Sequence, residues 1–430
     1  MDTAIDAPEV REYDVEAVNR KETRPPLYVP RKKIHPRRAH GFFRTFKWWV
    51  MAATLGIYYV TPWLRWDRGP GAPDQAVLVD IPGRRFYFFF IEIWPQEFYY
   101  IAGLLIMAGL GLFLVTSVVG RAWCGYACPQ TVWTDLFIWV ERLVEGDRGA
   151  RIRLDKEPMS AAKATKRLAK YVIWLIIAMG TGGAWVFYFA DAPTLLVDLV
   201  TGQAATVAYA TVGVLTFTTF TLGGFMREQV CTYMCPWPRI QAAMMDEESL
   251  TVTYRTDRGE PRKPFEKNAD WDTRGDCIDC KACVVVCPMG IDIRDGQQLE
   301  CITCALCIDA CDDVMGKIGR PRGLIDYDSI ANDERRREGK ETKLRLFRPR
   351  TLFYFALWAL IGLGMVYVLL TRSDLDINVI HDRNPLYTTL SDGSLRNGYT
   401  FKILNKAREQ RTLTLHASGL PGIALKVVGS

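Results

Sequence analysis

The sequence has few residues that could bind haem and no motif that binds a nucleotide. It contains four histidines in 430 residues, all in the two terminal segments: His35, His40, His381 and His416. Two axial haem ligands that face each other across membrane helices cannot be built from this distribution. No P-loop is present, and the glycine clusters lie inside apolar runs, where close helix packing explains them. These absences exclude such a haem cytochrome and leave no basis for a nucleotide or flavin site.

A strong charge bias and a secretion signal are also absent. The 54 Lys and Arg residues against 48 Asp and Glu residues give a net charge of +6. The basic residues lie mainly in the segments between the apolar runs and do not form one basic patch, so nucleic acid is not an expected partner. The first 40 residues contain no apolar stretch of the kind that a secretory signal needs, so we expect no signal peptide.

Five apolar segments are each long enough to cross a bilayer, which takes roughly 20 residues of helix. They lie at 48–64, 98–120, 171–190, 204–226 and 351–371. A buried helix of a soluble protein rarely runs so far without a polar face. The sequence therefore predicts an α-helical integral membrane protein with five transmembrane helices.

Lys and Arg residues are distributed unevenly between the connecting segments. Segments 1–47, 121–170 and 227–350 have 11, 10 and 21 of them, whereas 65–97 has 4 and 191–203 has none. Because positive charge stays on the cytoplasmic side, we expect the N-terminus inside and the C-terminus outside. None of the 12 cysteines then lies in the external tail, so we expect metal ligands or redox thiols instead of disulfides.

One cysteine motif occurs twice, after the second and after the fourth apolar run. Both copies have the form C-x-Y-x-C-P, with cysteines at Cys124 and Cys128 and at Cys231 and Cys235. Proline suits the first turn of a helix, so we expect Cys128 and Cys235 to be N-caps whose thiol pKa the helix dipole lowers. If the two halves pack as a pseudo-symmetric pair, four thiolates converge. Soft sulfur ligands of this kind select Cu(I), zinc or an iron–sulfur cluster.

The strongest motif lies in the charged segment 246–350. Eight cysteines form two runs with the spacing C-x2-C-x2-C-x3-C, which is typical of bacterial ferredoxins. In that arrangement the fourth cysteine of each run ligates the other cluster, so the spacing predicts two [4Fe–4S] clusters. One is assigned to Cys277, Cys280, Cys283 and Cys311, and the other to Cys301, Cys304, Cys307 and Cys287. Zinc is the alternative for a single CxxC pair, but it fits eight cysteines at these spacings poorly.

After residue 371 the pattern changes to alternating apolar and polar residues. The runs 399–404 and 412–415 predict β-strands. An immunoglobulin-like sandwich takes about 100 residues, so we expect the remaining 59 to form only part of one. The expected domains are a basic cytoplasmic tail at 1–46, a four-helix membrane domain at 47–245, a cytoplasmic α+β ferredoxin domain at 246–350, a fifth transmembrane helix at 351–371 and a periplasmic β domain at 372–430.

The order of these features resembles the cytochrome c oxidase accessory protein family (CcoG, also FixG or RdxA). The segments 80–87 and 91–100 are similar to the first external loop of that family. The resemblance implies an immunoglobulin-like C-terminal domain and a location in the bacterial inner membrane. It also implies that the protein reduces Cu(II) to Cu(I) during assembly of a cbb-type oxidase. Expected partners are copper ions, a copper-transporting ATPase or copper chaperone, oxidase assembly factors and an unidentified electron donor. The sequence leaves open whether the protein forms a homodimer.

Three functions follow from these features. The leading one is an oxidoreductase, a cupric reductase in which electrons from two cubane clusters reach copper at Cys124, Cys128, Cys231 and Cys235. There, copper is a substrate or a transient ligand. The second is a quinol dehydrogenase-like membrane ferredoxin subunit of a respiratory chain, since such subunits also combine paired spans with C-x3-C-P motifs. The third is a non-catalytic scaffold for oxidase assembly.

Overall fold

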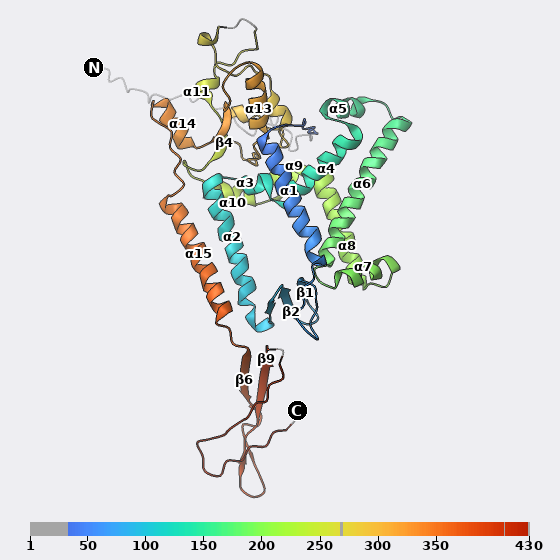
Figure 1. Cartoon of the computed structure of the whole chain (residues 1–430), viewed down its shortest axis with the longest axis vertical. Coiled ribbons are helices and arrows are strands. Elements are labelled where there is room, and N and C mark those ends of the chain that lie inside the picture. The colour runs from blue at the N-terminus through green and yellow to red at the C-terminus, as the bar shows by residue number, and fades with distance from the viewer. Residues whose placement is uncertain (1–32, 267–269, 408, 429–430) are drawn as a thin grey trace, which may run out of the picture. The chain divides into compact units, whose positions relative to one another are not determined.

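The computed structural model describes residues 33–266, 270–407 and 409–428. Most of the basic tail predicted at 1–46 therefore lies outside the described residues. The chain divides into two units, the first made of Met1–Glu92 and Val115–Arg345 and the second of Ile93–Leu114 and Leu346–Ser430. Figure 1 shows the whole chain with its elements labelled.

The first unit is mostly helical up to residue 245. Its helices are α1 (Phe42–Val60), η1 (Thr61–Trp63), α3 (Ala122–Tyr126), α4 (Pro129–Glu145), α5 (Arg148–Lys156), α6 (Ala161–Val186), α7 (Ala192–Thr201), α8 (Thr206–Thr219), the π-helix η3 (Phe220–Met226), α9 (Arg227–Gln229), the π-helix η4 (Val230–Met234) and α10 (Trp237–Met244). A small antiparallel sheet follows η1 in the order β1 (Val77–Asp80), β2 (Arg85–Phe88) and β3 (Ile91–Ile93).

Helices α4, α6 and α8 pack together around aromatic side chains. Helix α6 lies along α8 (Figure 1), and the ring of Trp174 in α6 stacks on Phe137 of α4 with centroids 5.2 Å apart. A Cβ atom at Gly182 would come within 2.8 Å of the carbonyl oxygen of Val212, so α6 and α8 approach this closely only with glycine at that position. Small residues allow such backbone contact between membrane helices.

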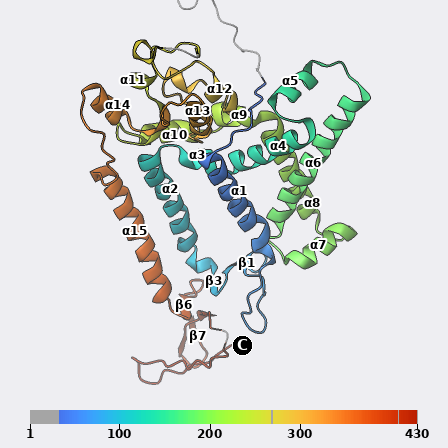
Figure 2. The same cartoon turned by 45° about the horizontal axis from the view of Figure 1, so that its top comes forward.

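The charged segment after α10 forms a small α+β fold, as predicted for a ferredoxin-like part. Strands β4 (Thr251–Tyr254) and β5 (Ile325–Asp328) pair antiparallel, and Val252, Met315 and Leu324 lie in the core beside them. Helices α12 (Ala282–Val286) and α13 (Leu306–Lys317) pack against each other (Figure 2). The helices are α11 (Thr256–Gly259), η5 (Trp271–Thr273), α12 (Ala282–Val286), η6 (Ile293–Asp295), α13 (Leu306–Lys317) and α14 (Ile330–Arg337).

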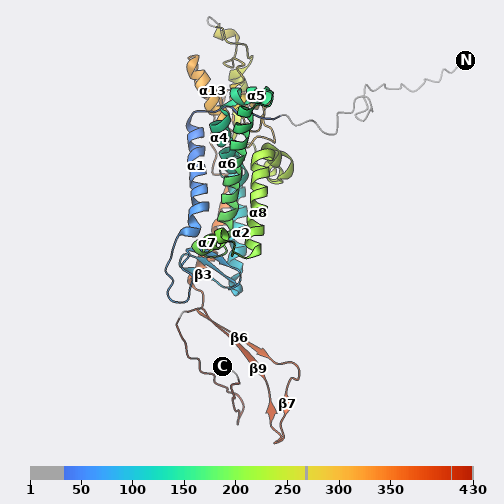
Figure 3. The same ribbon diagram turned by 90° about the vertical axis from the view of Figure 1, so that its right-hand side faces the viewer.

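The second unit joins two long helices to two strand pairs. Its elements are η2 (Pro95–Glu97), most of α2 (Tyr99–Val119), α15 (Pro349–Leu370), β6 (Leu375–His381), β7 (Thr388–Thr389), β8 (Leu395–Arg396) and β9 (Tyr399–Asn405). The indole N–H of Trp358 in α15 donates to the carbonyl of Met107 in α2 at 3.1 Å. Strand β9 pairs with β6 (Figure 3), which confirms the strand predicted at 399–404. The strand predicted at 412–415 is wrong, because among the described residues no strand pairs with this segment.

Four helical segments of the described residues are long and apolar enough to cross a membrane. They are Pro95–Val119, Ala161–Val186, Thr206–Met234 and Pro349–Leu370. These match four of the five predicted spans. The remaining prediction, at 48–64, overlaps α1, which is not among the four and which carries the buried cations Arg44 and Lys47 in its first turns.

Candidate metal centres

The cysteines Cys277, Cys280, Cys283 and Cys311 line one cavity in the ferredoxin part. Apolar side chains such as Met315 and Leu324 form most of its other walls, and Lys281 and Arg294 also line it. Cys277 and Cys280 come from the loop that leads into α12, Cys283 lies in α12, and Cys311 lies in α13. The structure therefore brings together the four residues that the spacing assigned to one cluster, although they lie in two separate runs.

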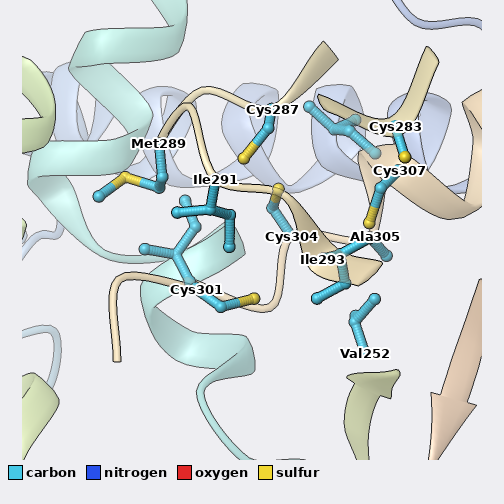
Figure 4. Close-up of a pocket in the computed structure, with 12 residues that line it drawn as sticks. Val252, Cys283, Cys287, Met289, Ile291, Ile293, Cys301, Cys304, Ala305 and Cys307 are labelled. Carbon is cyan, nitrogen blue, oxygen red and sulfur yellow. The ribbon is translucent and has the colours of Figure 1, made fainter. Parts of the chain in front are cut away.

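The cysteines Cys287, Cys301, Cys304 and Cys307 line a second cavity. Figure 4 shows their sulfur atoms directed into the same space, with Cys283 at its edge. Cys287 follows α12, whereas the other three precede or begin α13. This is the other predicted set.

Both cysteine loops use the same unusual backbone. The residues two and four positions after the first cysteine have positive φ in each run: 51° at Asp279 and 56° at Lys281, 55° at Thr303 and 59° at Ala305. Side-chain-bearing residues rarely adopt this conformation. Its repetition shows that the sequence duplication is also a structural duplication, in which each loop curls around its own cavity.

The cavity walls fit iron–sulfur clusters better than single metal ions. Burial raises the pKa of Cys287 to about 12 and that of Cys307 well above its ordinary value, so these thiols would ionise only against a bound cation. In the described part of the chain, no three His, Cys, Asp or Glu side chains converge closely enough to hold one metal ion, as a preformed zinc site would require. Four sulfurs spread around an apolar cavity suit a cubane, which would supply one-electron redox chemistry.

The four cysteines of the repeat lie close to one another, although they come from distant segments. Cys124 lies in α3, Cys128 precedes α4, and Cys231 and Cys235 lie in and after η4. Cys128 and Cys235 both act electrostatically on Cys124, and all three act on Cys231. The thiol of Cys124 also donates to the buried Gln241 at 3.0 Å. The pairing of the two halves therefore brings the four thiols into one region, although no three of them, among the described residues, converge closely enough to hold a metal ion in this structure.

The predicted helix caps are correct for one copy of the repeat and wrong for the other. Cys128 is the N-cap of α4, which begins at Pro129. In the second copy, α10 begins at Trp237 with Pro236 as its N-cap. Cys235 instead closes the preceding π-helix, where its backbone N–H donates to the carbonyl of Val230 at 2.8 Å.

The predicted lowering of the thiol pKa at Cys128 is also wrong. Burial raises the pKa of Cys128, although hydrogen bonds from the backbone of Thr131 and Gln130 act in the predicted direction. Burial likewise raises the pKa of Cys124 to about 11, and the nearby Arg121 opposes this only in part. Loss of solvation therefore outweighs the helix end at this site.

The repeat touches the second cysteine cavity directly. A Cβ atom at Gly125 would lie 2.6 Å from the carbonyl oxygen of Ile302 and 2.9 Å from the Cα of Cys304, so the backbone of α3 rests on the cysteine loop. A further small cavity is lined by Cys231 together with Met289 and Ile302, and these last two also line the Cys287 cavity. Sequence reasoning missed Gly125, which has no local signature beyond its place between two cysteines.

Buried ion pairs hold the helices around the second copy of the repeat. Glu141 of α4 accepts ion pairs at 2.6 Å from both Arg151 and Arg227, and Lys170 pairs with Glu145 at 2.9 Å. Burial disfavours the carboxylate of Glu141, but Arg227 and the other cations more than offset this and lower its pKa. The network links α4, α5, α6 and the segment before Cys231. Charged residues inside apolar helices were the signal that could have identified it.

Three domain families match parts of the chain. A 4Fe-4S dicluster domain matches residues 226–330, a 4Fe-4S binding domain matches 101–146, and the Ig-like fold at the C-terminal of FixG matches 365–430. Over 98% of its length the chain is 59% identical to the nitrogen fixation protein FixG of Rhizobium meliloti, of which it covers 86%. The chain belongs to the FixG family.

Two further members of the FixG family are comparably similar. Proteins RdxB and RdxA of Cereibacter sphaeroides are 61% and 60% identical over 94% of this chain, which covers 85% and 86% of them. No solved structure matches the chain. As a member of the FixG family with matched iron–sulfur domains and apolar helices, the protein is a membrane iron–sulfur electron-transfer protein.

Proposed function

We propose that the protein is a cupric reductase that supplies Cu(I) for the assembly of a cbb-type cytochrome c oxidase. The copper site is the thiol cluster of the repeat, formed by Cys124, Cys128, Cys231 and Cys235. The reaction at this site transfers one electron to Cu(II) and yields Cu(I). Thiolate sulfur is a soft ligand and favours the reduced ion, so the site itself promotes the reaction.

The contact between Gly125 and Cys304 is the observation that carries this proposal. It places the first copy of the repeat against the loop that would hold the second cluster, with no side chain between the two backbones. Cys124 packs in the same apolar group as Ile302 and Cys304. Electrons held by the ferredoxin part thus have a short, dry route to the repeat.

The cavity lined by Cys277, Cys280, Cys283 and Cys311 is the better place for an electron donor to dock. Cys280 is exposed, whereas the other cysteines of the ferredoxin part are buried or half-buried. We therefore propose that the donor, a one-electron reductant, docks near Cys280, and that electrons leave by the Cys287 cavity. A copper-transporting ATPase or a copper chaperone would then receive Cu(I).

The orientation of the chain is part of the same proposal. We propose five transmembrane helices, including α1, in the bacterial inner membrane, with the ferredoxin part in the cytoplasm and residues after 372 in the periplasm. The high Lys and Arg content of 121–170 and 227–350 supports this arrangement. Reporter fusions at Asp333 and Ser391 should be cytoplasmic and external, respectively, and an external report at Asp333 would invert the orientation.

Serine substitution at each of the four repeat cysteines tests the copper site. We expect C124S, C128S, C231S and C235S each to weaken Cu(I) binding at least tenfold and to slow cupric reduction, because a neutral hydroxyl is a poor ligand for a soft ion. Iron content should stay near the parental value. The matched control is T232A, which lies between two of these cysteines. If the four variants bind and reduce copper like the parent, the repeat does not bind copper, and the quinol dehydrogenase function becomes the better explanation.

A further inference from the structure

A cationic cavity lies beside the first turns of α1, away from all twelve cysteines. It is formed by the start of α1, the end of α4 and the loop before α5, and its volume is about 370 Å³. Ligand pockets commonly span about 300–1,000 Å³. Its lining residues are Arg38, Arg44, Trp48, Trp139, Arg142, Leu143 and Asp147.

The walls of this cavity carry three guanidinium groups and one carboxylate. Arg44 is 6% exposed and binds Asp135 through Nη1 at 2.9 Å, while its buried Nη2 has no hydrogen-bond partner among the described residues. Arg142 donates through Nη2 to the carbonyl of Pro36 at 3.2 Å, and its buried Nε also has no hydrogen-bond partner in the described chain. The Nε atom lies 3.8 Å from Asp147, whose side chain is half-exposed. The cavity therefore gathers three cationic side chains against one half-exposed carboxylate.

The charges around the cavity also favour the binding of an anion. Burial and the neighbouring charge of Arg44 lower the pKa of Arg142 to about 10, against the partial compensation of Asp135. Packing like charges together in a buried place costs free energy unless an anion binds between them. A phosphate group, with several acceptor oxygens, matches the guanidinium donors.

The rim of the cavity is aromatic and apolar. The guanidinium of Arg44 lies over the ring of Trp48 at 4.5 Å, and Trp48 meets Trp139 edge to face at 6.4 Å. Trp139 and Leu143 are both exposed, so this apolar rim continues onto the outside of the helices. Tryptophan is enriched at the headgroup level of membranes, and basic pockets between membrane helices bind anionic lipid headgroups.

We propose that this cavity binds the phosphate group of an anionic phospholipid, with the acyl chains along Trp139 and Leu143. The cationic floor alone would suit a free phosphate ion equally well. The apolar rim favours a lipid, because a phosphate ion has no apolar part to cover it. The proposal does not depend on the reaction at the repeat cysteines.

Lipid retention by the purified full-length protein tests the proposal. The parent should retain phosphatidylglycerol in preference to phosphatidylcholine when both are offered in mixed micelles and bound lipid is read by native mass spectrometry. We expect R142Q and R38Q to weaken phosphatidylglycerol retention about tenfold and severalfold, respectively, because each variant loses a charge and its hydrogen bonds to the phosphate group. The control R153Q removes an exposed arginine of α5 that does not line the cavity and should change nothing.

Three results would overturn the proposal. The first is equal retention of phosphatidylglycerol by the parent, R142Q and R38Q. The second is an equal loss in R153Q, which would indicate a diffuse charge effect. The third is binding of inorganic phosphate by a parent that shows no preference for phosphatidylglycerol over phosphatidylcholine. That result would indicate a site for a free anion. Iron content reports whether each variant is folded, and the exposed Arg38 gives a readout even if R142Q fails to fold.

Discussion

The cysteines of the ferredoxin part and those of the repeat occupy different kinds of site. The eight ferredoxin cysteines lie on two loops with a repeated positive-φ backbone and on the helices α12 and α13 that follow these loops, and they face cavities lined mostly by apolar side chains. The four repeat cysteines lie at helix ends, with polar groups such as Gln241 and Arg121 close to Cys124. A cavity with mostly apolar walls suits a resident cluster, whereas a site with polar neighbours suits an ion that must enter and leave. The comparison indicates one region for storing electrons and another for exchanging a substrate.

The two copies of the repeat also differ from each other, in secondary structure and in exposure. The first copy joins regular helices, but the second lies in and after the π-helix η4, which the short helix α9 separates from the π-helix η3. Arg227, the first residue of α9, has a φ of 34°, which is unusual for a residue with a side chain. Tyr233 and Met234 of the second copy are 80% and 55% exposed. The exposure of these two residues makes the second copy the more open half of the thiol cluster. Its π-helical turn agrees with a functional role, because such turns are frequent at functional sites.

The largest effect should come from removing a ligand of one cubane. C304S should lower iron from about eight atoms per chain to about four or fewer, because three thiolates hold a cubane poorly. The repeat thiols should still bind Cu(I). Iron, acid-labile sulfide and copper are measured on anaerobically purified protein. Zinc in place of iron and sulfide in the parent would contradict the assignment of the ferredoxin cavities.

The second effect concerns stability. E141Q should lower the free energy of unfolding by about 3–5 kcal/mol, because Arg151 and Arg227 would lose their buried partner. The measurement is the temperature at which the detergent-solubilised protein unfolds, with the exposed E157Q as control. Similar unfolding temperatures for E141Q and E157Q would show that the buried network contributes little.

A smaller effect should come from a substitution at the contact between the repeat and the second cysteine cavity, which removes neither site. G125A places a methyl group against Ile302 and Cys304, so the cysteine loop or α3 must shift, at a cost of about 1–3 kcal/mol. Both iron and copper binding should persist, while cupric reduction slows severalfold. The control is G109A, where a methyl group would meet no atom within 4 Å. Parental reduction rates in G125A would mean that this contact does not carry the electrons.

Sequence patterns predicted the local features of this protein well. Apolar runs located four membrane helices, cysteine spacing grouped Cys287 with the second run, and Pro129 located the start of α4. The second cap failed because a π-helix shifts the register before Pro236, and a π-helix has no simple sequence signal. The contact of Gly125 with Cys304 and the ion pair of Glu141 with Arg227 join segments far apart in the chain. Such contacts depend on tertiary packing, which local patterns do not specify.

A single-turnover experiment tests most directly whether the ferredoxin part reduces copper at the repeat. The protein is reduced anaerobically, freed of reductant and mixed with one equivalent of Cu(II), and the iron–sulfur absorbance and the Cu(II) electron-resonance signal are followed together. In the parent, reoxidation of the clusters should match the loss of Cu(II) one electron for one ion. In a variant with serine at Cys124, Cys128, Cys231 and Cys235, the clusters should stay reduced and Cu(II) should persist. Equal rates in the two proteins, with full iron in both, would contradict reduction at the repeat.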